Sequence, residues 1–192
     1  MNLRIEQDDD PMDPRKEFDP MGKMVCFHRR YSLGDEHDYR DGDYNGWDEL
    51  EAAIRKEENV VVMRPIFMYD HSGVTINTGG FSCPWDSGRI GMIYATREGV
   101  LREYGKKRVS KKMREEAEKR LEAEVVEYDQ YLRGDCWGYI VEDHLGEQLD
   151  SCWGFFGREY CEQEGKEQLA YFEAKEAQRE PSFIPAPVCA VA

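Results

Sequence analysis

The chain has 192 residues and a formal net charge of −14, from 40 acidic and 26 basic side chains. A hydrophobic content of 40% with 12% aromatic residues is too rich for a disordered chain, while 34% charged residues indicate a very polar globule. The length allows one domain with a hydrophobic core and leaves little room for two. No run of about 18 apolar residues and no signal-like start is present, so we expect a cytoplasmic protein.

The chain begins with residues that lack any hydrophobic period. Residues 1–22 contain three consecutive aspartates and three prolines, which predicts an extended or disordered lead-in. We expect a single α+β domain over residues 23–180. Proline and small residues then predict a flexible tail over residues 181–192.

Strands are predicted where apolar and β-branched residues lie between turn residues. These segments are 24–31, 60–69, 74–78 and 89–95. Two Cys-Trp-Gly-aromatic tetrapeptides, at 136–139 and 152–155, flank a turn and predict a hairpin. Alternation along its strands places the glycines on one face, where we expect a helix to pack closely.

Helices are predicted where a capping residue precedes an apolar period. Asp48, Thr96 and Ser110 are the expected N-caps of helices over 49–58, 97–104 and 111–132. A last helix, 158–180, carries the apolar stripe Cys161, Gly165, Leu169 and Phe172. Together these elements predict an α+β fold, with a mainly antiparallel sheet of about 5–6 strands packed with 3–4 helices.

Charge is distributed unevenly along the chain. Residues 1–58 carry 17 acidic and 9 basic side chains, residues 59–110 carry 4 and 7, and residues 111–192 carry 19 and 10. The acidic ends repel nucleic acid and attract basic protein surfaces. The cluster Lys106–Lys107–Arg108 with Lys111 and Lys112 begins an acidic helix and is interpreted as a solvated linker.

Carboxylates on the long helix recur at steps of three, four and seven, which predicts an anionic face that binds a partner. We assign to this face Glu115, Glu118, Glu122, Glu124, Glu127 and Asp129, extended by Glu162, Glu164, Glu167 and Glu173. The alternative is that these charges only keep the protein soluble.

A second candidate site is a pocket formed by His28, His71, Cys83, Trp85, Asp86 and Arg89. Cys83 and a histidine could form a nucleophile pair oriented by Asp70 or Asp86, or hold zinc together with Cys26. No nucleophile elbow or zinc spacing accompanies these residues. We therefore assign no catalytic residue.

Metal and lipid motifs are incomplete. Asp41, Asp43 and Asn45 match the first positions of a calcium loop, but the twelfth position is Ala52 instead of glutamate. These three residues are a weak metal candidate, and we predict no metal and no cofactor.

The six cysteines are expected to be reduced. The last four residues fit a prenylation pattern without the usual second signal, so a plain tail is favoured.

Several short motifs resemble a family of proteins of unknown activity encoded by phages and mobile elements of bacteria. The resemblance spans about residues 14–157. It rests on the segments MVCFHRRY (24–31) with LGD (33–35), YDHSG (69–73), FSCPWDSG (81–88), YDQYL (128–132) and DSCWGF (150–155). It implies an accessory protein acting in the cytoplasm of a bacterial host and carries no catalytic role to particular residues.

Charge and resemblance together favour one functional hypothesis. The chain is expected to be an inhibitor or nucleic-acid-mimicking decoy of a host DNA- or RNA-binding defence protein, of the anti-restriction or anti-CRISPR type. Its partner would offer a basic groove, and neither nucleic acid nor a membrane would bind directly. The alternatives are a small enzyme or ligand- or metal-binding module at the second site, and an accessory interaction protein of undefined role. The enzyme alternative is the less favoured.

Overall fold

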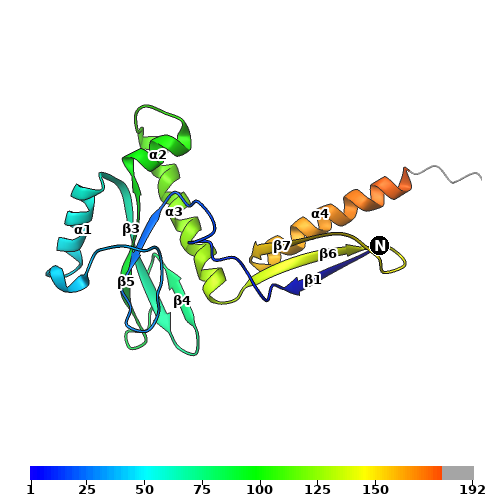
Figure 1. Ribbon diagram of the computed structural model, residues 1–192, viewed down its shortest axis with the longest axis horizontal. Coiled ribbons are helices and arrows are strands. Elements are labelled where there is room, and N and C mark those ends of the chain that lie inside the picture. The colour runs from blue at the N-terminus through cyan, green and yellow to red at the C-terminus, as the bar shows by residue number, and fades with distance from the viewer. Residues whose placement is uncertain (179–192) are drawn as a thin grey trace, which may run out of the picture. The chain divides into compact units, whose positions relative to one another are not determined.

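The computed structural model describes residues 1–178, which form two compact units (Figure 1). The central unit comprises residues 9–136, and the terminal unit joins residues 1–8 to the chain from residue 137 onward. Across the described residues, four helices accompany seven strands in two antiparallel sheets. The predicted α+β class is therefore confirmed, although the strands are divided between two sheets.

The central unit is built on a four-stranded sheet with the order β2-β5-β3-β4. Its strands are β2 (Lys23–Cys26), β3 (Val60–Asp70), β4 (Val74–Asn77) and β5 (Ser87–Thr96). Met24 lies opposite Ile93, and Met68 lies opposite Ile76. The hairpin of β3 and β4 is the one that the turn at residues 70–73 predicts.

Helices cover both faces of this sheet (Figure 1). Met92 and Tyr94 of β5 pack against α1 (Trp47–Glu57). Ile93 and Ala95 point the other way, toward α2 (Arg97–Tyr104) and α3 (Lys111–Leu132). Successive side chains of a strand alternate between faces, so a continuous apolar run is what a sheet buried on both sides requires.

The helix ends follow the local chemistry of their capping residues. The hydroxyls of Thr96 and Ser110 accept hydrogen bonds from Gly99 N–H and Met113 N–H, as predicted. Gly105 ends α2 with a φ of 59°, a conformation that glycine adopts without steric cost. Asp48 lies within the first turn of α1, whose N-cap is Gly46, so the predicted cap is wrong by two residues.

The terminal unit is a three-stranded sheet with α4 (Arg158–Ala177) on one face. The strands are β1 (Asn2–Gln7), β6 (Cys136–Glu142) and β7 (Gln148–Phe156), in the order β1-β6-β7. Tyr139, Val141 and Cys161 form the centre of its core. The predicted hairpin and the predicted apolar stripe of the last helix are both present.

Glycines shape this unit differently from the prediction. Gly138 is covered by the Trp153 ring, which occupies the space that a side chain at residue 138 would need. The helix packs on the opposite face, and the glycine that allows its close approach is Gly165 of α4 itself, beside Leu3 and Tyr139.

Three boundaries differ from those expected. Residues 2–7, within the lead-in predicted to be extended or disordered, are extended but belong to a folded sheet, because Leu3 and Ile5 of β1 pack in the core of the terminal unit. Pairing of β1 with β6 also divides the single domain expected over residues 23–180. Strand β2 ends at Cys26 rather than at Tyr31. The tail over residues 181–192 lies outside the described residues.

Candidate functional site

Glu124, predicted to belong to the acidic face, is a buried structural residue. Its side chain is 7% exposed and accepts hydrogen bonds from the N–H groups of Met21 and Gly22 at 3.0 and 3.1 Å. The buried Arg15 pairs with Glu124 at 3.3 Å and with Asp35 at 2.5 Å. The prediction is wrong here because helical periodicity does not reveal that a distant segment covers this side of α3.

Asp129 is also used within the fold. Its Oδ1 accepts hydrogen bonds from the Thr75 hydroxyl at 2.6 Å and from the Ile76 N–H at 2.7 Å. Its other oxygen pairs with Arg133 at 3.0 Å. Asp129 therefore fixes α3 to the edge strand β4 and is a structural residue rather than part of a free acidic face.

The other α3 carboxylates are largely paired. Glu118 and Glu122 lie at 2.5 and 3.4 Å from the Arg64 guanidinium of β3. Glu115 is 3.8 Å from Lys111 and remains more than half exposed. Burial raises the pKa of Glu127 above its usual value. Most of the negative charge of α3 is thus compensated inside the central unit.

Carboxylates on α4 are less compensated. Glu162 pairs with Arg158 at 3.0 Å and with Lys166 at 3.6 Å, and the hydrogen bond from Arg158 lowers its pKa. Within residues 1–178, by contrast, no cation lies within 4.0 Å of Glu164, Glu167 or Glu173. The terminal unit carries 13 acidic and 5 basic side chains in total.

Two exposed tyrosines accompany these carboxylates. Tyr160 and Tyr171 are 55% and 56% exposed. Tyr160, Glu164, Glu167 and Tyr171 follow one another at steps of four, three and four, so they line one side of the helix. We call these four residues the α4 stripe. The carboxylates were predicted from the sequence, whereas the tyrosines were not, although their helical spacing is readable there.

The second predicted site does not form as one pocket. His71 Nδ1 and Cys83 Sγ lie at 3.4 and 3.8 Å from the same Asp86 oxygen, in exposed loops. The carboxylate thus lies between the thiol and the imidazole, which is not the order a nucleophile and base require. Trp85 is 91% exposed.

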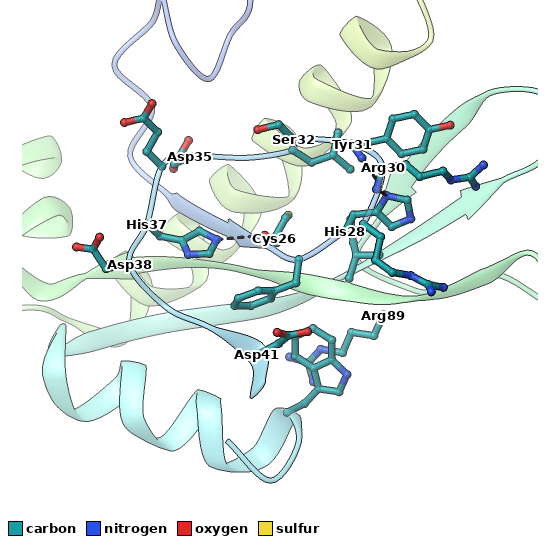
Figure 2. Close-up of a pocket in the computed structure, with 16 residues that line it drawn as sticks. Cys26, His28, Arg30, Tyr31, Ser32, Asp35, His37, Asp38, Asp41 and Arg89 are labelled. Carbon is teal, nitrogen blue, oxygen red and sulfur yellow. Dashed lines mark hydrogen bonds between the residues drawn. The ribbon is translucent and has the colours of Figure 1, made fainter. Parts of the chain in front are cut away.

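His28 and Arg89 instead line an open groove of about 1350 Å³ in the central unit (Figure 2). Its walls are the loop from Cys26 to Asp41, the start of α1 and part of β5. Arg30, at its rim, pairs with Asp70, the residue before His71. Sequence reasoning missed Tyr31, His37 and Trp47, which lie in the same groove. Tyr31 belongs to the motif at residues 24–31, whereas no motif in the sequence indicated His37 or Trp47.

Metal ligands are not assembled. Asn45 donates from its backbone N–H and its side chain to Glu49, both at 2.8 Å, and does not converge with Asp41 and Asp43 on a common point. Among residues 1–178, no three His, Cys, Asp or Glu side chains are placed to hold a metal ion. Cys26 faces the groove as a neutral thiol, since burial raises its pKa to about 12.

Comparisons do not connect these sites to a known protein. None of the helices within residues 1–178 combines the length and apolar character needed to cross a membrane. No protein-family model, no curated protein and no solved structure matches the chain.

Proposed function

We propose that this protein is an accessory protein of a bacterial phage or mobile element that binds a basic, nucleic-acid-binding protein of the host. It acts as an inhibitor or decoy of the anti-restriction or anti-CRISPR type. The observation that carries this proposal is the α4 stripe, in which two exposed tyrosines flank two carboxylates that have no cationic partner among residues 1–178.

The chemistry of the α4 stripe suits a partner rich in arginine and lysine. A carboxylate offers two acceptor oxygens that a guanidinium binds in the same forked manner as it binds a phosphate. Free Glu164 and Glu167 can form such contacts without first breaking an ion pair of their own. The surplus of negative charge on the terminal unit adds long-range attraction toward a basic groove.

Tyrosines supply what charge alone does not. A large, semi-rigid aromatic side chain buries apolar area at low entropic cost, and tyrosine is enriched among residues that dominate binding energy. Tyr160 and Tyr171 stand at both ends of the carboxylate pair. The α4 stripe therefore combines an apolar contact with an anionic centre, which a purely solubilising surface does not need.

The proposal moves the predicted acidic face from α3 to α4. Glu124 and Asp129 are occupied by contacts within the central unit, and Glu118 and Glu122 share Arg64. Using them for a partner would require those contacts to break. In the α4 stripe, by contrast, no ion pair among residues 1–178 has to break, and the one side-chain hydrogen bond is the long, exposed contact from Gln163 to Glu167 at 3.4 Å.

The test is capture of partners from a bacterial lysate by tagged protein, with bound proteins quantified by mass spectrometry. The variant Glu164→Lys/Glu167→Lys is expected to recover a nucleic-acid-binding partner at least about tenfold less than the wild type. The control Glu103→Lys/Glu115→Lys makes the same charge change at exposed positions of the central unit and should capture normally.

Two further conditions separate the decoy from nonspecific attraction. Raising the salt concentration or adding competing DNA should release the partner, since both compete for its basic groove. Tyr160→Ala/Tyr171→Ala should also weaken capture while leaving the net charge unchanged. Equal recovery with the α4 variants and the control would contradict the proposal.

A further inference from the structure

The groove of the central unit has properties that the proposed partner binding does not use. It is bounded by the loop from Cys26 to Asp41, by Trp47 of α1 and by Arg89 of β5. Phe27, Tyr31 and Trp47 supply aromatic rings to its lining. Polar and charged side chains lie among them (Figure 2). An aromatic lining with a few placed polar groups is typical of small-molecule sites.

One part of the groove presents hydrogen-bond donors. His28 Nδ1 accepts from the N–H groups of Arg30 and Tyr31 at 3.4 and 3.3 Å, so the ring proton of the neutral imidazole is on Nε2. The ring stacks on Tyr31 with centroids 5.0 Å apart and planes 9° apart. His28 is thereby held with a defined donor atom.

Two arginines strengthen this donor end. The Arg89 guanidinium lies 4.6 Å from the Trp47 ring centroid, and its Nε and Nη2 bond to Gly91 O and Glu51. Its Nη1 is bonded to no protein group within residues 1–178. Arg29 also lines the groove and has no ion pair among those residues. Such donors suit an anionic group with several oxygens.

The opposite end of the groove presents acceptors. Figure 2 shows Asp35 and Asp38 well separated from His28 and Arg30. Asp35 is held by Arg15, whereas Asp38 makes no hydrogen bond or ion pair within the described part of the chain. A carboxylate in this position can accept hydrogen bonds from the hydroxyls of a sugar, as acidic residues do in nucleotide sites.

His37 lies between the two ends of the groove, and one of its ring nitrogens has no hydrogen-bond partner among residues 1–178. Its Nε2 donates to the Cys26 carbonyl at 3.1 Å, which leaves Nδ1 as an acceptor. That Nδ1 is buried and has no hydrogen-bond partner. Buried polar atoms are normally satisfied, so this orphan indicates an internal water or a donor that residues 1–178 do not supply. The atom has almost no accessible surface, so a ligand lying in the open groove is not required to contact it.

We propose that this groove binds a nucleoside phosphate. The phosphate lies at the end formed by His28, Arg29 and Arg89, and the sugar hydroxyls lie toward Asp38. The base contacts the aromatic lining of Phe27, Tyr31 and Trp47. Asp41 also lines the groove and lies near Arg89 in Figure 2, so a carboxylate is present at both ends. Donors at His28, Arg29 and Arg89 together with the unpaired carboxylate of Asp38 favour a ligand that carries an anion and hydroxyls on one molecule over an inorganic anion.

The test is calorimetric titration of the full-length protein with adenosine and guanosine triphosphates at 0.15 M salt. Inorganic pyrophosphate and free adenosine serve as partial probes. Saturable binding of at least one triphosphate is expected, at least about tenfold tighter than pyrophosphate and adenosine. No binding of either triphosphate, or equal affinity for pyrophosphate, would overturn the proposal.

Variants locate the site. Arg29→Gln and Asp38→Asn alter side chains without ion pairs in the described structure, so folding is preserved, and each should raise the Kd at least about fivefold. Arg97→Gln removes the same charge from an exposed position of α2 and should leave the Kd unchanged. Equal effects of Arg29→Gln and Arg97→Gln would contradict this location. The α4 variants change residues of the terminal unit and the groove variants change residues of the central unit, so failure of either proposal is distinguishable from failure of the other.

Discussion

At the scale of single residues, the buried cluster of Arg15, Asp35 and Glu124 ties the chain near residue 20 to α3. The Arg15 side chain is only 2% exposed, and Nη2 donates to the Gly22 carbonyl at 2.6 Å as well as to Asp35. A charge removed from water in this way is tolerated only when its partners are complete. The stability of the central unit should therefore be sensitive to any one member of the cluster.

Glu124→Ala is expected to lower the free energy of unfolding by about 3 kcal/mol, because it removes one of the two carboxylates that pair with the buried Arg15 and leaves two backbone N–H groups without an acceptor. Glu115→Ala on the same helix is the control and should cost no more than about 0.5 kcal/mol, as is usual for exposed positions. Urea denaturation followed by circular dichroism measures both values. Similar costs for the two variants would show that Glu124 is not structural.

Thiol reactivity should differ sharply between cysteines. Burial raises the pKa of Cys26 to about 12, with a further contribution from Asp35, so almost no thiolate exists near neutral pH. Cys152 is exposed. We expect iodoacetamide at pH 8 to label Cys152 at least about tenfold faster than Cys26, as measured by peptide mass spectrometry. Equal rates would mean that Cys26 is accessible.

Residue roles were only partly predictable. The spacing of Glu118, Glu122 and Asp129 placed them correctly on one side of the helix, but it could not show that Arg64 and β4 lie against that side. Glu164 and Glu167 were identified by the same reasoning and remain free of cations among residues 1–178. The spacing of residues along a helix predicts the side of the helix on which each one lies. Which other segment packs against that side depends on the tertiary structure.

At the scale of elements, α4 lies against its sheet at a point of close approach. A Cβ added at Gly165 would be 2.8 Å from Leu3 Cδ1 and 3.1 Å from Tyr139 Cβ. The Leu3 side chain is in a core that also contains Val141 and Cys161. The helix cannot accept a larger residue here without moving away from β1 and β6.

Gly165→Ala is therefore expected to destabilise the terminal unit by about 1–3 kcal/mol, in spite of the better helix propensity of alanine. The control is Gln163→Ala on the exposed side of α4, which should leave the free energy of unfolding nearly unchanged. Thermal denaturation measures the difference. A stabilising effect of Gly165→Ala, equal to that of an exposed helical site, would contradict the described packing.

Elements with strong local signals were predictable. Ser110, Thr96 and Gly105 mark helix ends through their own hydrogen bonds and backbone angles, so the sequence suffices to locate them. Strand β1 was missed because the residues of β6 with which it pairs lie 130 to 140 positions away along the chain. Leu3 and Ile5 alternate with polar residues, as in a half-buried strand, but the alternation is short. The charged stretch that follows it favoured the prediction of an extended or disordered segment instead.

At the scale of the whole molecule, the described residues form two compact units, each with its own hydrophobic core, where one domain was expected. The first eight residues and the last part of the chain share one core, and the residues between them form the other. Sequence composition reveals neither the pairing of distant strands nor a boundary at residues 136 and 137. The same limit applies to the groove, whose lining comes from one loop, one helix and one strand.

Alkaline pH should destabilise both units. Burial raises the pKa of Cys26 to about 12, of Tyr39 to about 12, of Cys161 to about 11 and of Tyr139 to about 12. In the unfolded chain these cysteines and tyrosines have lower pKa values than in the folded protein. At a pH between the two values, the groups lose their protons only in the unfolded state, so the free energy of unfolding falls as the pH rises.

Urea titrations under reducing conditions at pH 8, 9.5 and 10.5 should give progressively lower midpoints. Cys26→Ser and Cys161→Ser should reduce the pH dependence, because serine does not ionise in this range. A midpoint that is constant from pH 8 to pH 10.5 would show that these groups are not buried as described.

The most direct measurement of the central claim is carboxyl footprinting of the captured complex. Carbodiimide coupling of an amine probe, read by peptide mass spectrometry, reports which carboxylates a partner covers. Labelling of Glu164 and Glu167 is expected to fall several-fold on binding, while labelling of Glu103 and Glu115 stays unchanged. Unchanged labelling of Glu164 and Glu167 in a complex that salt dissociates would contradict the claim that the α4 stripe is the binding surface.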